Sequence, residues 1–345
     1  MTESDRAASP APTLRDVANH AGVSPMTVSR TLRGDRGVSF DTRRRVQEVV
    51  NKLGYRPNEL ARSLRMGGRV GLVGLIVPNL ANPFYSRLAL GLESALETSG
   101  LKLVLGNTGE DQSREQRMVN EVIERRVDGI VVVPTGTDHD HLKPTALNDT
   151  PIVFAGRPPQ GLDTDCVLVD DFGGARNATR ELIKHGHTTI GLIGNVPTIY
   201  TGAERFRGFC AALQEAGLPL VDRHITRDCT DVQSARAAAT HLLTQENRPT
   251  ALFTANNRMT LGALLAASEV RQSVVLAGFD AVEYAPLIDR PLILVDYNSD
   301  EIGRRAGELL IARLTATPGS PARPPARMTV TTVLRRYGSA TVSRS

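Results

Sequence analysis

Two patterns of apolar and polar residues divide the chain. Near the N-terminus, apolar side chains recur three or four positions apart, as do Val17 and Ala21 and then Val28 and Leu32. This spacing predicts short helices that each bury one face. From Val70 onward, short continuous apolar runs alternate with amphipathic stretches, which indicates parallel strands connected by helices. The chain of 345 residues is long enough to combine a small helical unit with a larger α/β unit.

The small unit begins with two helices on either side of a turn at Gly22. Ser24 is placed to cap the second helix, and Pro25 suits its first turn because an N–H would have no partner there. Two helices joined by a tight glycine turn are typical of a helix-turn-helix, whose second helix can enter the major groove of DNA. An ordinary helical hairpin would keep the apolar positions but would not require exposed Arg30 and Arg33.

A third helix is predicted from Ser39 or Asp41 to about Leu53, and its apolar face would close a three-helix core. The charge of the chain indicates a polyanionic partner for this region. Residues 1–69 hold 13 Lys and Arg against 7 Asp and Glu, whereas the remaining residues hold 28 against 30. The basic surplus is therefore confined to the N-terminal fifth, where Arg43–Arg45 are placed to contact DNA phosphates.

A further short helix is predicted to begin at Pro57, with Ala61 and Leu64 on one face. A helix of about eight residues does not persist alone in water. Without a partner, this segment would be a flexible linker.

The larger unit is predicted to contain two βαβ series. Such series fold as doubly wound parallel sheets, which bind ligands at the carboxyl ends of their strands. Strands are expected at 70–78, 101–106, 129–133, 152–155, 167–169, 189–194, 251–254 and 273–277. Helices are expected at 84–99, 114–126, 173–185, 203–216, 233–244 and 258–267. Asp111 is interpreted as a helix cap.

The motifs of common α/β enzymes do not occur in the sequence. No GxGxxG follows the first strand, and there is no GxSxG, GxxxxGK[ST] or cluster of His and Cys. His185-Gly186-His187 lies between a helix and a strand, which favours a glycine turn over a metal site. Cys166, Cys210 and Cys229 lack metal-ligand or CxxC spacing. Because these motifs and spacings are not found, we expect no metal or cofactor. Because no run of about 18 apolar residues and no export leader is found, we expect a cytoplasmic protein.

The stretch from Leu14 to Leu32 resembles the headpiece of LacI-family transcription regulators, and later motifs extend the resemblance over nearly the whole chain. These motifs, in the order of the family, are Asn82-Pro83-Phe84-Tyr85, Arg126-Val127-Asp128-Gly129-Ile130, Asp170-Asp171-Phe172-Gly173-Gly174-Ala175, His185-Gly186-His187, Arg205-Phe206-Arg207-Gly208-Phe209, Ala255-Asn256-Asn257, Gly278-Phe279-Asp280 and Leu334-Arg335-Arg336-Tyr337-Gly338-Ser339. The resemblance implies an α-helical helix-turn-helix headpiece followed by an α/β periplasmic-binding-protein-like sensor of two doubly wound parallel-sheet lobes.

The resemblance also implies how the chain is divided. A disordered tail (1–12) precedes the headpiece (13–56), a hinge helix and linker (57–69), and an effector-binding and dimerisation domain (70–345). Three crossovers should join the two lobes of that domain. The implied N-lobe takes about 70–169 and 299–327, the C-lobe takes about 170–298 and 328–345, and the crossovers lie near 169–171, 296–299 and 327–329.

In this family the hinge helix folds on DNA and pairs with that of its dimer mate in the minor groove. By position, Leu64 would wedge between base steps there, and Ala61 would allow the two helices to approach closely. In the second headpiece helix, Arg30 alone has a bidentate option, to guanine. The DNA contacts that the resemblance implies are Thr13, Pro25, Met26, Thr27, Ser29, Arg30, Arg33, Asn58, Ala61 and Leu64.

The same resemblance places Phe84, Arg157, Arg205, Asn256 and Asp280 around a cleft between the lobes. Arginine, amide and carboxyl groups bond hydroxyls in fixed directions, and an aromatic face can cover the C–H surface of a sugar ring. These residue types suit a polyhydroxylated or an anionic guest. From the residues alone, Asp280 could instead cap a turn, and Arg205 could form a surface ion pair.

The C-terminal half departs from the pattern of the family. Asn257 stands where the family often has Asp, Ala281 where a second Asp usually follows, and Tyr297 at the position of a common Gln. The segment Ser268–Val274 is also several residues shorter than usual. An unusual effector, a narrow specificity or weakened switching would each fit these changes.

We therefore predict a cytoplasmic, nucleoid-associated repressor that binds a near-palindromic DNA operator as a homodimer, under the control of a sugar-like small-molecule effector. A regulator that responds to a purine or a phosphorylated metabolite is the alternative, because Arg157 and Arg205 could face an anion. A transport-type sugar-binding protein would not need the basic headpiece. An α/β enzyme would need a set of catalytic residues, and we identify none. We also expect no membrane partner.

Overall fold

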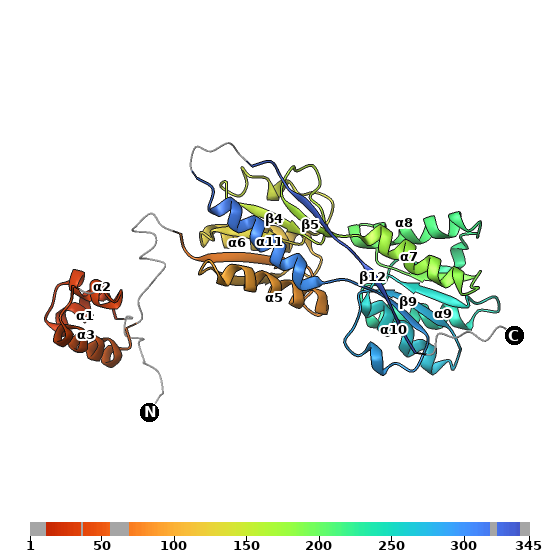
Figure 1. Ribbon diagram of the computed structural model, residues 1–345, viewed down its shortest axis with the longest axis horizontal. Coiled ribbons are helices and arrows are strands. Elements are labelled where there is room, and N and C mark those ends of the chain that lie inside the picture. Colours follow the sequence, from red (N-terminus) through yellow and green to blue (C-terminus); the bar gives the residue numbers. More distant parts are fainter. Residues whose placement is uncertain (1–11, 36, 56–68, 318–322, 339–345) are drawn as a thin grey trace, which may run out of the picture. The chain divides into compact units, whose positions relative to one another are not determined.

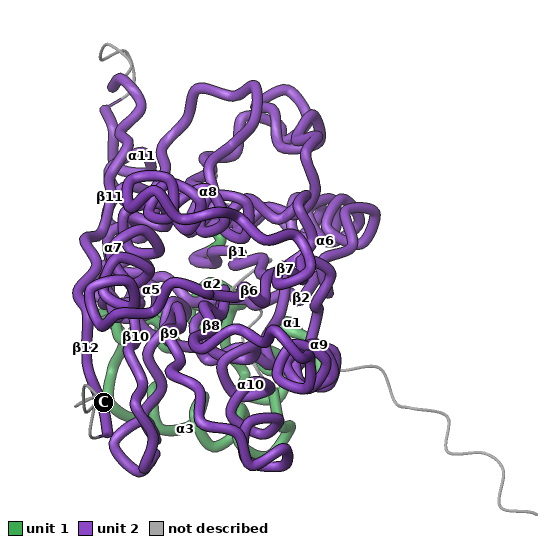
Figure 2. Tube along the Cα trace, turned by 90° about the vertical axis from the view of Figure 1, so that its right-hand side faces the viewer, with its two compact units in different colours: residues 1–70 green, residues 71–345 purple. Residues whose placement is uncertain are grey.

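The computed structural model describes residues 12–35, 37–55, 69–317 and 323–338. The chain divides into two compact units, Met1–Val70 and Gly71–Ser345 (Figure 2). In the described part of the chain, no helix is both long and apolar enough to cross a membrane.

The first unit, which we call the headpiece, is a three-helix bundle of α1 (Leu14–Ala21), α2 (Pro25–Leu32) and α3 (Phe40–Leu53). Each helix begins at a hydroxyl residue whose side chain accepts a hydrogen bond from a backbone N–H of the first turn: Thr13, Ser24 and Ser39. The third helix therefore begins after Ser39 and not at Asp41. The small core consists of Val17, Ala18, Ala21, Val28, Val46 and Val50.

The second unit contains two six-stranded sheets, one in each lobe (Figure 1). The N-lobe sheet is parallel throughout, in the order β11-β5-β4-β3-β1-β2. Its strands are β1 (Leu72–Val77), β2 (Lys102–Asn107), β3 (Gly129–Val132), β4 (Ile152–Ala155), β5 (Cys166–Val169) and β11 (Arg327–Val330). Its helices are α5 (Pro83–Glu97), α6 (Gln112–Glu124) and α11 (Ser299–Leu314).

The C-lobe sheet has the order β12-β10-β9-β8-β6-β7. Its strands are β6 (Ile190–Ile193), β7 (Ile225–Thr226), β8 (Ala251–Thr254), β9 (Val275–Phe279), β10 (Leu292–Asp296) and β12 (Val333–Tyr337). Its helices are α7 (Asp171–Lys184), α8 (Tyr200–Glu215), α9 (Val232–Thr244) and α10 (Asn257–Glu269). The prediction of two doubly wound parallel sheets is confirmed, except that the edge strand β12 runs antiparallel to β10.

Both faces of the central strands are buried, which explains why their sequences are continuous apolar runs and do not alternate. The edge strand β2 differs, since Val104 and Leu105 are about two-fifths exposed (40% and 39%).

The chain crosses between the lobes three times. The first two crossings, after β5 and after β10, fall in the predicted segments. The third lies after Val330, later than the predicted 327–329, because β11 pairs with β5 of the N-lobe along its whole length. The prediction that the C-lobe resumes at residue 328 is therefore wrong. β11 has only one buried residue, Val330, so its hydrophobic pattern did not indicate which sheet it joins.

The second crossing returns the chain to the N-lobe, where α11 packs against α5. Two glycines permit this close approach. A Cβ atom on Gly91 would lie 1.9 Å from the carbonyl oxygen of Asp300, and one on Gly303 would lie 1.9 Å from that of Leu88. The α5–α11 pair therefore anchors the segment that leads from the C-lobe back to the N-lobe.

Candidate functional site

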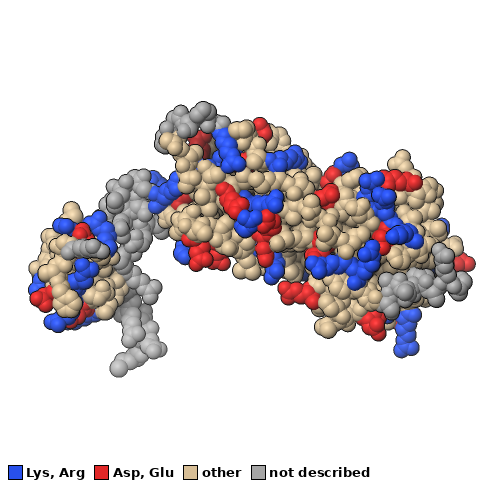
Figure 3. Space-filling model, viewed as in Figure 1, with Lys and Arg blue, Asp and Glu red and all other residues tan. Residues whose placement is uncertain are grey.

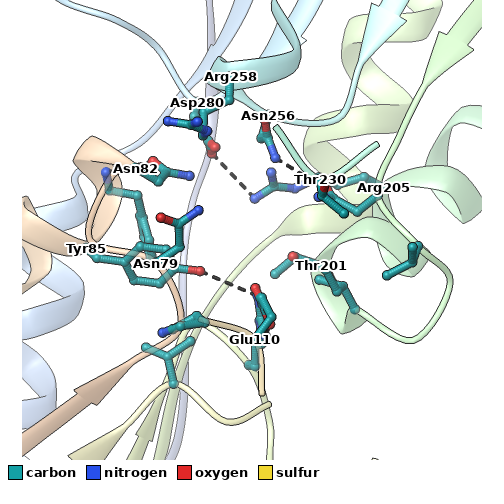
Figure 4. A pocket seen from close by; sticks show the side chains of 18 of the residues that line it. Asn79, Asn82, Tyr85, Glu110, Thr201, Arg205, Thr230, Asn256, Arg258 and Asp280 are labelled. Atoms are coloured by element: carbon teal, nitrogen blue, oxygen red, sulfur yellow. Dashed lines mark hydrogen bonds and ion pairs between the residues drawn. The ribbon is translucent and has the colours of Figure 1, made fainter. Parts of the chain in front are cut away.

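A cavity of about 400 Å³ lies between the two lobes, at the carboxyl ends of strands from both sheets (Figure 4). All five side chains predicted to surround the cleft line it: Phe84, Arg157, Arg205, Asn256 and Asp280. Figure 4 shows Asn79, Asn82, Tyr85 and Glu110 on the N-lobe side, facing Thr201, Arg205, Asn256 and Asp280 on the C-lobe side. The structure thus brings together residues that are up to about two hundred positions apart in the sequence.

The N-lobe side is centred on Arg157, which is only 5% exposed. Its two terminal nitrogens donate to both carboxylate oxygens of Glu110, at 2.8 and 2.6 Å. Nη1 also donates to the carbonyl oxygen of Pro134 at 3.0 Å, and Nη2 lies 3.5 Å from the hydroxyl of Tyr85. We call these side chains the Arg157 centre.

The C-lobe side is centred on Arg205, which is 6% exposed. Its Nε donates to Oδ1 of Asp171 at 2.7 Å, and its Nη1 donates to the carbonyl oxygen of Ala255 at 2.6 Å. Its Nη2 lies 3.4 Å from Oδ1 of Asp280, and the guanidinium stacks 3.6 Å above the ring of Phe279. Arg205 is therefore a buried residue that contacts several partners, and it does not form a surface ion pair.

Asp280 directly follows β9 and adopts a left-handed φ of 68°. Its Oδ1 accepts a hydrogen bond of 2.7 Å from the hydroxyl of Tyr297. Asp280 is thus not a turn cap, because it joins Tyr297 to Arg205. We call Arg205, Asp171, Asp280 and Tyr297 the Arg205 centre.

The aromatic surface of the cavity comes from Phe84 and its neighbours. The ring centroid of Phe84 lies 4.9 Å from that of Tyr85, edge to face, and 6.1 Å from that of Tyr297. Phe84 belongs to the N-lobe and Tyr297 to the second crossing, so ring contact spans the two sides of the cavity. An apolar face is thereby placed beside the polar groups.

Among the described residues, two side-chain hydrogen bonds connect the lobes directly. The Asn257 amide donates to Oδ1 of Asn82 at 2.9 Å, and Nη1 of Arg258 donates to the carbonyl oxygen of Ala81 at 3.2 Å. Asn82 and Asn256 cap the N-termini of α5 and α10 with their side-chain oxygens. The departure at Asn257 therefore has a structural consequence, because an aspartate there would have no proton to donate to Asn82 Oδ1.

Burial changes the titration of several groups in the cavity wall. It raises the pKa of Asp171 to about 6, against the attraction of Arg205. It also raises the pKa of Tyr85 to about 12 and that of Tyr297 well above its ordinary value. Because their pKa values are raised, both tyrosine hydroxyls are neutral near neutral pH. Oδ2 of Asp171 is buried and has no hydrogen-bond partner in the described part of the chain.

Sequence reasoning gave no site role to four residues of the two centres: Tyr85, Glu110, Asp171 and Tyr297. Tyr85 and Asp171 stood within the family motifs, and Tyr297 was noted as a departure from the family. Each missed residue had a usable signal. Glu110 follows strand β2, at the sheet edge where ligands bind in such folds. Asp171 follows β5, and Tyr85 is adjacent to the predicted Phe84. Asp111, in contrast, caps α6 as predicted, accepting from Arg114 N at 2.9 Å.

Apart from Thr13, the predicted DNA-contacting residues of the headpiece lie on or next to α2. Pro25, Met26, Arg30 and Arg33 are exposed, as is Thr13 at the start of α1, whereas Thr27 and Ser29 are partly buried. Met26 is a large apolar side chain with 66% of its surface exposed. The other three predicted contacts, Asn58, Ala61 and Leu64, lie outside the described residues.

Arg30 is held by the loop after α2. Its Nε donates to Oδ2 of Asp35 at 3.0 Å, and the backbone N–H of Gly37 donates to the other carboxylate oxygen. These two donors, Gly37 first and Arg30 second, lower the pKa of Asp35. Asp35 therefore stays charged and orients the guanidinium that we predict contacts guanine.

Basic and acidic side chains are mixed on the surface of the second unit. On the face shown in Figure 3, they lie next to one another over much of this unit.

The described residues contain no evident metal site. Among them, no group of three His, Cys, Asp or Glu side chains is arranged to hold a metal ion. Gly186, with φ of 89°, forms the turn after α7 as predicted, and the three cysteines are free.

Comparison with known proteins accounts for both units. Residues 13–58 match the model of bacterial regulatory proteins of the lacI family, and residues 71–331 match that of periplasmic binding proteins and the sugar binding domain of the LacI family. The chain is 34% identical to the ribose operon repressor of Escherichia coli K12 over 334 residues, which cover 95% of this chain and 99% of that protein.

Solved structures show the same fold. The transcriptional regulator CelR in complex with cellobiose is 30% identical, with a TM-score of 0.68, over 94% of this chain and 98% of that one. The lac repressor dimer bound to operator and an anti-inducer is 23% identical, with a TM-score of 0.77, over the same shares of the two chains. At that identity, the second likeness concerns the fold alone.

Proposed function

The chain belongs to the LacI family of transcriptional regulators, and from this premise we propose that it is a repressor controlled by a neutral, polyhydroxylated effector of the sugar class. The family consists of DNA-binding regulators and not of enzymes. The cytoplasm, at the nucleoid, is the compartment that this function requires.

The observation that carries the choice of effector is the pairing of two of the three arginines that line the cavity, Arg157 and Arg205, with carboxylates. The third, Arg258, donates to the backbone carbonyl oxygen of Ala81. Arg157 is paired with Glu110, and Arg205 with Asp171 and Asp280. A phosphate or carboxylate ligand would have to displace one of these partners or lie beside it uncompensated. Hydroxyl groups avoid that cost because they both donate and accept. Phe84 offers the apolar face that a sugar ring needs. Relatives named for ribose and cellobiose support the same class.

A thermal-shift screen of the full chain against neutral sugars, sugar acids, sugar phosphates and purines tests this choice. A neutral sugar should raise the melting temperature most. A ligand present at 100 times its Kd stabilises the folded protein by about 2.7 kcal/mol, which the screen can detect. The hit should then change the affinity for operator DNA. If a purine or a sugar phosphate is the best ligand, the alternative effector class is correct and the proposal is wrong.

The DNA half of the function requires two copies of the chain. A near-palindromic site is bound by two recognition helices in successive major grooves. Exposed apolar side chains on the N-lobe support a homodimer: Leu90 on α5 is 56% exposed, and Val104 and Leu105 on the edge strand β2 are 40% and 39% exposed. Leu90→Glu should give monomers in sedimentation and reduce operator affinity. A variant that stays dimeric would exclude this surface.

The operator can be selected from a pool of random duplex DNA with the full chain. We expect a near-palindromic consensus. Arg30→Ala should lose about 1–3 kcal/mol of discrimination at one guanine of each half-site. Leu64→Ala should weaken binding to the selected site and its bend far more than non-specific binding, because the proposed wedge acts only in the specific complex. Equal losses on both kinds of DNA would contradict the hinge proposal.

Control by the effector would act through closure of the two lobes. The hydrogen bonds Asn257–Asn82 and Arg258–Ala81 already join the lobes across the cleft, so a ligand can shift an existing contact and need not create one. The effector must bind the two states of the sensor unequally, and the change would then order or release the hinge helices.

A further inference from the structure

We propose that Glu110 is a built-in carboxylate that determines the charge specificity of the cavity. Resting on the proposed function, this inference states that Glu110 occupies the place which an acidic ligand would take on Arg157. The sensor therefore accepts neutral polyols and rejects the corresponding sugar acids. Removing the carboxylate should convert the N-lobe side into a site for an acid.

The hydrogen bonds of Arg157 leave no terminal N–H for a second carboxylate. Each terminal nitrogen of an arginine carries two N–H groups. Nη1 donates to Glu110 and to the carbonyl oxygen of Pro134, and Nη2 donates to Glu110 and points to the hydroxyl of Tyr85. The two bonds to Glu110 are the parallel, bidentate pair that arginine otherwise makes with carboxylate ligands. An acidic ligand can make the same bidentate pair with this arginine only by displacing Glu110.

Glu110 reaches Arg157 from a loop with an uncommon backbone. Gly109 and Glu110 both have left-handed φ values, 69° and 64°, and such a conformation is unfavourable for a non-glycine residue. The loop is fixed at its far end, where Asp111 caps α6. The Glu110 side chain is 33% exposed and lines the cavity, whereas that of Arg157 is 6% exposed. The carboxylate is thus aimed into the cavity and accessible to a competing ligand.

The contrast with the other arginine identifies Glu110 as the determinant. Asp171 and Asp280 are buried, with side chains 2% and 8% exposed, and they hold Arg205 from within the C-lobe. A ligand cannot exchange with Asp171, since that carboxylate does not line the cavity. Asp280 lines the cavity but its side chain is only 8% exposed, so Glu110, at 33%, is the most accessible carboxylate of the two centres.

The test measures the binding of matched pairs of neutral and acidic sugars to the full chain by calorimetry: D-ribose with D-ribonate, D-glucose with D-gluconate and D-galactose with D-galactonate. The wild type should prefer the neutral member of the pair that binds best by tenfold or more. Glu110→Gln, which keeps the shape and removes the charge, should change the acid-to-neutral affinity ratio by at least tenfold in favour of the acid. Glu110→Ala should change the ratio in the same direction.

The control is Glu124→Gln, which makes the same charge change at an exposed position at the end of α6. It should leave the ratio unchanged. If the neutral sugar binds but neither Glu110 variant changes the ratio, this inference is wrong and the proposed function stands. If the wild type binds the acid as tightly as the neutral sugar, the inference is also wrong. If no sugar or acid binds the wild type or either variant, the sugar-class effector is rejected together with the inference.

Discussion

The Arg157 and Arg205 centres contain the same kinds of group in different degrees of burial. Each holds a buried guanidinium, at least one carboxylate and a tyrosine hydroxyl. In the Arg205 centre, every carboxylate is buried and comes from the first turn of a helix or the end of a strand. In the Arg157 centre, the carboxylate comes from a loop and is partly exposed to the cavity.

This difference indicates which centre is structural and which is adaptable. Charges buried without water depend on their partners, whereas an exposed carboxylate can be hydrated when its partner is lost. The Arg205 centre should therefore maintain the C-lobe whether or not a ligand is bound. The Arg157 centre should instead respond to the chemistry of the ligand. Substitutions in the two centres should then have unequal effects on stability.

The largest difference is expected from the arginines themselves. Arg205→Met should lower the free energy of unfolding by about 3–5 kcal/mol at pH 7, because Asp171 and Asp280 stay buried without a cation. Arg157→Met should cost only about 1–2 kcal/mol, since Glu110 can take up water in place of the lost bonds. Urea unfolding of both variants measures the two values.

Arg207→Met is the matched control for the Arg205 variant, because it lies on the same helix with a 65% exposed side chain paired to Glu204. It should change stability by no more than about 0.5 kcal/mol. Equal losses for Arg157→Met and Arg205→Met would show that the two centres are equivalent and would remove the basis of the comparison.

A second difference should depend on pH. Burial raises the pKa of Asp171 in the folded protein from 3.8 to about 6. The folded state then binds this proton more tightly than the unfolded chain. The resulting stabilisation is complete below about pH 3.8 and is lost as pH rises through about 6. At ~1.4 kcal/mol per pKa unit, the loss amounts to a few kcal/mol.

Urea unfolding of the wild type and Asp171→Asn at intervals from pH 4 to pH 7 isolates this effect. The stability of the wild type relative to the variant should decline across that range and then level off. The two proteins would have parallel profiles if Asp171 were not perturbed by its burial, and the Arg205 centre would then not be as closed as its geometry indicates.

The sequence predicted the scaffold of these centres better than their bonds. Apolar runs and helix caps placed most elements before β10 within a few residues, because burial on both faces of a parallel sheet leaves a strong local pattern. No ranges were predicted for β7 or for β10, α11, β11 and β12. β7 has two residues, too few for any pattern, and β11 has only one buried residue, so its partner strand was not encoded in its hydrophobicity.

The five predicted cavity residues came from resemblance to a family, and the structure places them around one cavity. The partners of the arginines could not be obtained in this way. Glu110 and Arg157 are 47 positions apart, and Arg205 and Asp280 are 75 apart. No periodicity links such positions, since their pairing depends on how loops at the strand ends meet. For that reason the sequence left an anionic effector open, whereas the carboxylates on both arginines favour a neutral one.

The smallest expected difference concerns the two tyrosines. Tyr297 donates to Asp280 at 2.7 Å, so Tyr297→Phe should cost about 1.5 kcal/mol or more, as for other hydrogen bonds to a charged group. Tyr85 lies 3.5 Å from Arg157, beyond a strong hydrogen bond, and Tyr85→Phe should cost no more than about 0.5 kcal/mol. Both rings keep their packing in the phenylalanine variants, so urea unfolding reports the hydroxyls alone.

A double-mutant cycle separates each bond from its surroundings. Tyr297→Phe combined with Asp280→Asn should show a coupling energy of about 1 kcal/mol, whereas Tyr85→Phe combined with Arg157→Met should be additive within about 0.5 kcal/mol. Coupling in the first pair alone would mean that the Arg205 centre is a connected network and that the Arg157 centre is a single exchangeable ion pair. Coupling of similar size in both pairs would mean that Tyr85 interacts with Arg157 as strongly as Tyr297 does with Asp280. A ligand would then displace Glu110 from Arg157 less readily.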